Sequence, residues 1–188
     1  MTKKGQDNLR ARLRTDTRTS HEELDREVSS FDLTRPDGFA CFLRMQATAL
    51  NTLRGNIMSQ ASAEMVCDLL ERAEADLRQL GYPVDERQMK LDVVHPMAID
   101  YVIAGSRLGT QILKKRWFSA TDAKVRSAAS YFCAPSYIEA WAAFRANAEK
   151  MPSTGPLADQ IIRDTDRIFQ IYRECARASF KGVGIVHA

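Results

Sequence analysis

Long stretches of helix-forming residues make up most of this chain, and glycine and proline fall mainly between those stretches. Few segments alternate apolar and polar residues with a period of two, so the pattern predicts about seven helices and no sheet. A chain of 188 residues is long enough to bury one hydrophobic core. We therefore expect a single all-α domain over residues 1–188, a helical bundle in which residues 1–7 and 180–188 are flexible tails.

Local signals set the expected helix boundaries. A first helix is expected over residues 8–29, and a second from Pro36 to about Gln60. Ser62 is expected to cap a third helix that stops at Gly81. Later helices are expected to begin at His95-Pro96, at Thr121-Asp122, at Pro135 and after a break at 151–156. The last helix is expected to bury one apolar face, formed by Ile161, Ile168, Ile171, Tyr172 and Cys175.

Net charge, hydropathy and cysteine spacing exclude some classes of protein. The net charge of +3 is too small to indicate nucleic-acid binding, and no apolar run approaches the roughly 18 residues of a membrane span. The excess of positive charge lies in the first eighteen residues, which could form a tail, a partner surface or an anion clamp. The four cysteines are widely spaced, which favours buried reduced thiols in a cytoplasmic protein.

Two glycines inside one predicted helix are the most informative local feature. Gly105 and Gly109 each cost helix stability relative to alanine, and their spacing of four places them on one face. Tyr101, Leu108 and Ile112 flank that face, so the glycines are expected to point inward. The spacing by itself favours a tight helix crossing; the alternative is a flat ligand lying against the backbone.

A histidine on the first predicted helix is the second candidate feature. His21 falls in the same helical sector as Leu13, Thr17, Leu24 and Val28, and hence on the expected buried side. A neutral imidazole in that position could bind a metal, and nearby arginines could pair with ligand carboxylates. The more common alternative is an ordinary, partly buried histidine beside surface arginines.

Together these segments resemble the biliverdin-producing heme oxygenases, especially the bacterial branch associated with bilin-using phytochromes. The stretch from Tyr101 to Gly109 is similar to the distal-helix motif Y-V-x-x-G-S-x-L-G of that branch. The stretch from Leu13 to Leu24 is similar to the proximal-helix motif, and Phe39-x-x-Phe42-Leu43 matches the start of the next helix. The resemblance covers residues 9–177 and implies a fold in which heme lies between the first helix and a kinked distal helix.

The resemblance also implies roles for individual residues. His21 would be the axial iron ligand, and Gly105, Ser106 and Gly109 would form the distal wall at which heme is cleaved. Residues implied to contact the heme are Arg14, Thr17, Arg18, Tyr101 and Arg145. Heme would be both cofactor and substrate, with dioxygen as co-substrate and biliverdin, carbon monoxide and ferrous iron as products.

Partners follow from the same resemblance. Electrons would come from a ferredoxin, a flavodoxin or a flavoprotein reductase, because the chain has no flavin or nicotinamide fingerprint. A bilin-using phytochrome could receive the product. Two rival interpretations remain: a non-catalytic heme sensor or carrier, which Ala104 and Thr110 motivate as departures from the branch's pattern, and a heme-free helical interaction module.

Overall fold

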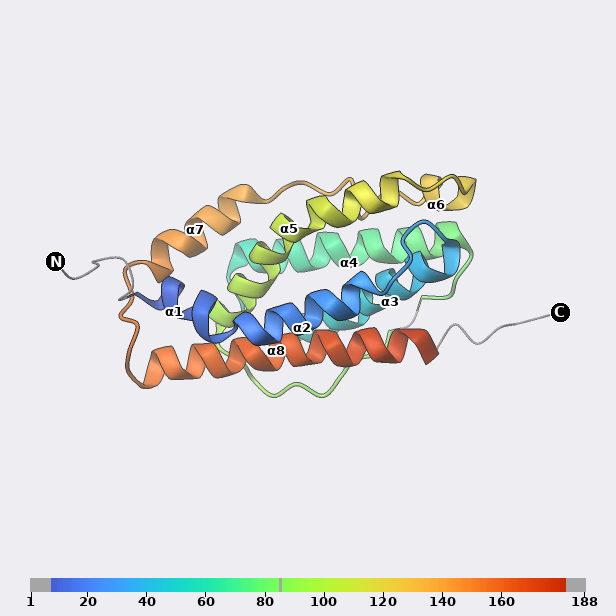
Figure 1. Cartoon of the computed structure of the whole chain (residues 1–188). Coiled ribbons are helices and arrows are strands. Elements are labelled where there is room, and N and C mark those ends of the chain that lie inside the picture. Colours follow the sequence, from blue (N-terminus) through green and yellow to red (C-terminus); the bar gives the residue numbers. More distant parts are fainter. Residues whose placement is uncertain (1–7, 85, 182–188) are drawn as a thin grey trace.

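The protein is all-helical in its computed structural model, which describes residues 8–84 and 86–181 (Figure 1). That part of the chain holds no strand beyond one isolated bridge between Asn8 and Pro152. Its helices are α1 (Leu9–Asp16), α2 (Arg18–Ser29), α3 (Pro36–Leu53), α4 (Gln60–Leu80), α5 (Pro96–Phe118), α6 (Ala123–Ser127), α7 (Ile138–Ala148) and α8 (Pro156–Lys181). The all-α class predicted from the sequence is therefore confirmed.

Helix ends follow local capping chemistry. The Asn8 side chain accepts a hydrogen bond from the Ala11 amide, and the Asp122 carboxylate accepts from the Lys124 and Val125 amides. Gly81 ends α4 in the left-handed conformation, with φ of 86°, as the sequence predicted.

The helix α3 lies at the centre of the fold. It packs against α4 on one side and α8 on the other, while α2 and α5 also pack on α8 (Figure 1). Its two phenylalanines, Phe39 and Phe42, stack on Phe132 with ring centroids 5.6 and 5.7 Å apart, which fills the core with flat rings. The expected core face of α8 is confirmed, because Ile161, Ile168, Ile171, Tyr172 and Cys175 are all buried.

Several expected boundaries were wrong. The first helix breaks at Thr17, whose hydroxyl donates to the Leu13 carbonyl oxygen at 2.7 Å, a side-chain bond that competes with regular helix bonding. Ser59 rather than Ser62 caps α4, and α3 ends at Leu53 rather than near residue 60. The helix expected at Pro135 begins at Ile138.

The expectations for the tails and for the cysteines were also partly wrong. The helix α8 continues through residues 180 and 181, which were expected to belong to the tail; residues 1–7 and 182–188 lie outside the described part of the chain. Cys41 and Cys175 are buried free thiols as expected, but Cys67 and Cys133 are exposed. Within residues 8–84 and 86–181, no helix combines the length and apolar character needed to cross a membrane.

Candidate functional site

Both ends of α5 touch the segment that carries His21. At one end, the Tyr101 phenol lies within hydrogen-bonding reach of the Thr17 side chain. At the other end, the Arg116 guanidinium donates to the carbonyl oxygens of Ser29 and Phe31 at 3.1 and 2.8 Å. The facing surfaces of α5 and α2 are therefore fixed at two points, roughly 22 Å apart along α5 at 1.5 Å per residue.

Between those two points α5 presents an open apolar face. Gly105, Leu108 and Ile112 lie on the same helical stripe as Tyr101 and Arg116, and so face α2. The helix α2 packs along α8 rather than along α5 (Figure 1). As a result Leu108 is 54% exposed and Ile112 is 68% exposed. The sequence pattern indicated an inward-facing stripe; in the fold this stripe faces open space beside α2 instead of the core.

The glycines of α5 do not serve a tight helix crossing. A Cβ atom built on Gly109 would meet no atom of the described residues within 4 Å. A Cβ atom on Gly105 would lie 3.5 Å from the Trp141 ring, which is ordinary van der Waals contact. Close packing with another helix therefore does not require glycine at either position, although both glycines leave extra room at the open face.

His21 projects from α2 with its imidazole half exposed. Its Nδ1 atom lies 3.1 Å from the Asp25 carboxylate one turn later, and its ring meets Phe169 of α8 edge to face, with centroids 5.5 Å apart. Of the sector shared with His21, Thr17 is buried, whereas Leu24 and Val28 are only half-buried. The expectation that His21 lies on a buried side was wrong for the imidazole, which is 54% exposed although its edge contacts Phe169.

Asp25 was not singled out in the sequence, although its spacing of four from His21 was visible there. A carboxylate that accepts a proton-bearing Nδ1 fixes the tautomer of the imidazole and leaves Nε2 as the electron-pair donor. With Asp25 beside Nδ1, Nε2 is the nitrogen of His21 that could bind a metal ion.

A group of cations lies at the Tyr101 end of the open face. Burial raises the pKa of the Tyr101 phenol, and the Thr17 contact and the charges of Arg14 and Arg10 partly offset that rise, so both arginines lie near the phenol. Arg10 also forms an ion pair with Glu149 at 2.6 Å, and Arg145 approaches the same carboxylate at 4.0 Å.

The fold thus brings Arg14 and Tyr101 to one end of the site and adds Arg10, which sequence reasoning missed; Arg145 is connected to this group through the Glu149 carboxylate. The Arg10–Glu149 pair spans 139 residues, so nothing local in the sequence indicated it. Arg18 is placed differently, because it pairs with Glu22 along α2 at 2.6 Å and is largely exposed.

Ser106 and Thr110 lie within the glycine segment of α5. The exposed Ser106 donates its hydroxyl hydrogen to the Ile103 carbonyl oxygen at 2.8 Å. Thr110 is buried and donates to the Ser106 carbonyl oxygen at 3.0 Å, on the opposite side of α5 from the open face. Ala104 is buried as well. Neither Ala104 nor Thr110 therefore occupies the space beside Gly109.

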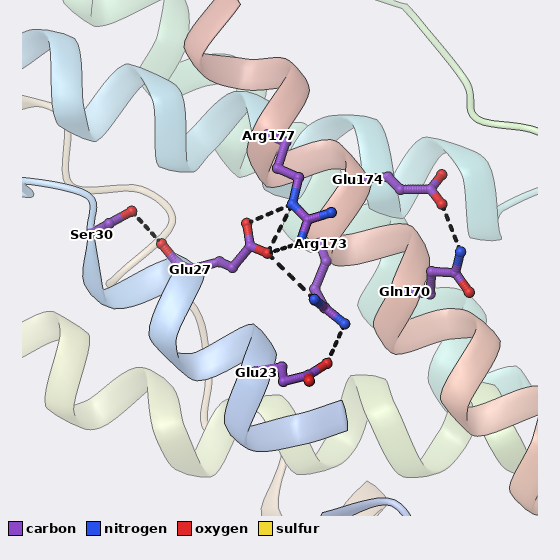
Figure 2. Close-up of polar contacts among 7 residues, drawn as sticks. All are labelled: Glu23, Glu27, Ser30, Gln170, Arg173, Glu174 and Arg177. Atoms are coloured by element: carbon purple, nitrogen blue, oxygen red, sulfur yellow. Dashed lines mark hydrogen bonds and ion pairs between the residues drawn. The ribbon is translucent and has the colours of Figure 1, made fainter. Parts of the chain in front are cut away.

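An ion-pair network fixes α2 against α8. Glu27 accepts hydrogen bonds from Arg173 and Arg177, at 3.4 and 2.9 Å for the two Nε atoms, and Arg173 also pairs with Glu23 (Figure 2). Glu27 is only 21% exposed, so solvent screens this network less than it screens a fully exposed pair. The network holds the helix that carries His21 from the side away from α5.

In the described part of the chain, no three His, Cys, Asp or Glu side chains gather as a metal site. A heme iron needs only an axial protein ligand, because the porphyrin supplies four nitrogens. Comparison with models of known protein families finds no match for this chain, and comparison with curated proteins finds no significant relative.

Proposed function

We propose that the chain binds heme between α2 and α5 and cleaves it oxidatively to biliverdin, carbon monoxide and ferrous iron. The observation that carries the proposal is the open apolar stripe of α5, with Gly105 and Gly109 on it, opposite a histidine whose Nδ1 lies 3.1 Å from the Asp25 carboxylate. This combination suits a flat, apolar ligand with a metal at its centre. The resemblance of both helices to heme oxygenase motifs supports the same assignment.

The residues present fit heme in each part of the site. His21 would bind the iron through Nε2, and the Asp25 carboxylate beside Nδ1 would orient the imidazole and make it a stronger ligand. Leu108 and Ile112 offer exposed apolar surface whose burial under a ligand is favourable, at about 25 cal/mol per Å². The absent side chains of Gly105 and Gly109 leave room for dioxygen and for close approach of backbone.

The cationic end would fix the orientation of the ligand. Arg10 and Arg14 lie near Tyr101, and Arg145 approaches the Glu149 carboxylate that pairs with Arg10, so the two carboxylates of a heme could form charge-assisted hydrogen bonds at this end. A ligand held at its carboxylates and at its centre presents the same edge to the distal wall in every molecule. Ser106 shares a face of α5 with Thr110, away from the open stripe, so ordered water at the reacting edge would be held by backbone groups of the glycine segment.

Heme would supply the redox chemistry when bound, with dioxygen and externally donated electrons consumed in the reaction. The protein contributes no acid, base or nucleophile in this proposal. Its residues bind the ligand, orient it, and cover its apolar faces with Leu108, Ile112 and the Trp141 ring. The basic N-terminal segment would dock an acidic electron donor.

One experiment tests the proposal directly. Purified protein is titrated with hemin, its absorption spectrum is recorded, and ascorbate or a ferredoxin system is then added under oxygen. We expect a Soret band that saturates at one hemin per chain and then disappears as biliverdin absorption rises. A stable Soret band under reductant would show a heme carrier or sensor, and a failure to bind hemin would support a heme-free interaction module.

A further inference from the structure

Arg107 carries a buried charge in the middle of α5. It lies between Gly105 and Gly109 in sequence, but its side chain is 4% exposed and lies on the face of α5 opposite the open stripe. Burying a guanidinium is costly unless its partners compensate, so its contacts bear on its role.

The contacts of Arg107 are few and specific. Its Cζ atom lies 5.5 Å from the centre of the Tyr131 ring and 5.9 Å from that of Tyr137, so the cation rests between two aromatic faces. Its Nη1 atom donates to the Thr110 hydroxyl oxygen at 3.4 Å. Its Nε atom is buried and has no hydrogen-bond partner among the described residues.

Through Thr110, Arg107 reaches the backbone of the glycine segment. The Thr110 hydroxyl accepts from Arg107 and donates to the Ser106 carbonyl oxygen, and Ser106 in turn donates to Ile103. Such bonds from side chain to helix backbone weaken the regular bonding of a helix and bend it. Figure 1 shows α5 bending near its middle, where these residues lie.

Through its contact with the Tyr137 ring, Arg107 also acts on α7, the helix whose Trp141 lies beside Gly105. The Tyr137 phenol donates to Asp68 of α4, which also accepts from Arg72 at 2.7 Å. Tyr137 has φ of 51°, a conformation uncommon for a residue with a side chain, and immediately precedes α7. That helix brings Trp141 to 3.5 Å from a Cβ atom built on Gly105.

We propose that Arg107 is a positioning residue of the ligand site, which fixes from behind the course of α5 between Gly105 and Gly109 and the place of Trp141 beside it. The inference rests on the heme site proposed above. Arg107 touches neither the ligand nor the open face; it acts through Thr110 on the backbone and through Tyr137 on the start of α7.

The test uses the full chain with two variants that break the contact in different ways. Arg107→Met removes the charge and the fork of donors, and Thr110→Val removes the hydroxyl with little change of volume. Arg72→Met is the matched control, because the charges of Arg72 and Arg107 both act on Asp68, while the hydrogen bonds of Arg72 go to Asp68 and to the Ser130 carbonyl oxygen rather than to α5. Arg107→Lys tests whether charge alone suffices.

Three readouts are compared: amide hydrogen exchange of residues 105–110 in hemin-free protein, the spectrum of the hemin complex, and the mixture of biliverdin isomers. In both Arg107→Met and Thr110→Val we expect at least tenfold faster exchange, a hemin affinity within threefold of wild type, an altered spectrum and a mixed product. Arg72→Met should behave as wild type, and Arg107→Lys should recover only part of the protection.

Unchanged exchange and spectra in Thr110→Val would overturn the inference even if Arg107→Met does not fold. Equal effects in Arg72→Met and Arg107→Met would also overturn it, because the cause would then be charge balance at Asp68. If the wild-type chain binds no hemin, the proposed function fails, whereas the exchange data still decide whether Arg107 fixes α5.

Discussion

The imidazole of His21 stands edge-on to the ring of Phe169, with 5.5 Å between the ring centroids. Phe169 is buried in α8, so one side of the imidazole contacts the core while about half of the side chain is exposed. The core contact and the Asp25 carboxylate, 3.1 Å from Nδ1, together favour one orientation of the ring. A ligand entering beside α5 would meet an imidazole that is already oriented.

We expect His21→Ala to lose the axial ligand, so that hemin binds weakly, with a high-spin spectrum, and is no longer converted to biliverdin. His95→Asn is a matched control, because His95 caps α5 through Nδ1 and asparagine also caps helices. Absorption spectra and biliverdin yield are the measurements. Wild-type spectra in His21→Ala would show that another residue binds the iron.

Charge reversal at the cationic end should weaken hemin binding. Arg14→Glu replaces a cation near Tyr101 and Arg145→Glu replaces the cation beside Glu149, and each should cost more than the ~1 kcal/mol typical of an exposed pair. The control is Arg78→Glu, which reverses an exposed cation that pairs only along α4 with Glu74. Hemin titration measures the effect; equal affinities in all three variants would remove both arginines from the site.

Filling the space at Gly109 should separate stability from function. A Cβ atom on Gly109 meets no described atom within 4 Å, and leucine is the better helix former, so for Gly109→Leu we expect unchanged or higher stability, by up to about 1 kcal/mol. The same side chain would occupy the ligand space and abolish biliverdin formation. Gln111→Leu, at an exposed position on the same helix, should leave activity intact. A thermally destabilised Gly109→Leu protein that still forms biliverdin would contradict the proposed ligand face.

The α2–α8 network should contribute to stability in a salt-dependent way. Glu27→Gln removes the carboxylate shared by Arg173 and Arg177, and we expect unfolding to become easier by about 1 kcal/mol at low salt. Glu22→Gln breaks an exposed pair on the same helix and should change stability far less. Denaturant unfolding at two salt concentrations distinguishes them. Equal losses of unfolding free energy in both variants would show that the shared carboxylate contributes no more to stability than an exposed pair does.

Asp166 should make the protein less stable at neutral pH. Burial raises the pKa of its carboxyl, and its Oδ1 atom has no hydrogen-bond partner among the described residues. The native state therefore holds the proton more tightly than the unfolded chain, whose aspartates titrate near about pH 3.9. Stability is full below that pH and falls as the pH rises through the raised native pKa.

Asp166→Asn removes this dependence. We expect a melting temperature a few degrees higher at pH 7, at about 2–4 °C per kcal/mol for a chain of this size, and no difference below about pH 4. Asp92→Asn is the control, since that exposed carboxylate pairs with Arg167 at 2.8 Å and its loss should not stabilise. A melting temperature for Asp166→Asn that is no higher at pH 7 would contradict the assignment.

Several helix ends were predictable because their signals are local. Pro96, Pro156 and Gly81 mark ends of helices in the fold as they did in the sequence, since each acts on its own backbone. Ser59 and Ser62 offer the same capping group three residues apart, so composition could not choose between them. The break at Thr17 depends on a side-chain bond to Leu13 that regular helix patterns do not reveal.

The sequence by itself determined the all-α class, the two glycines on one face of α5, and the placement of His21 one turn before Asp25. These features depend on helical period alone, which every residue of a helix shares. Only the tertiary structure decided that α2 packs on α8 and leaves the glycine face open, and that Arg10 meets Glu149 across 139 residues. Those relationships depend on how distant helices pack, and a helical wheel shows which residues share a face but not what covers it.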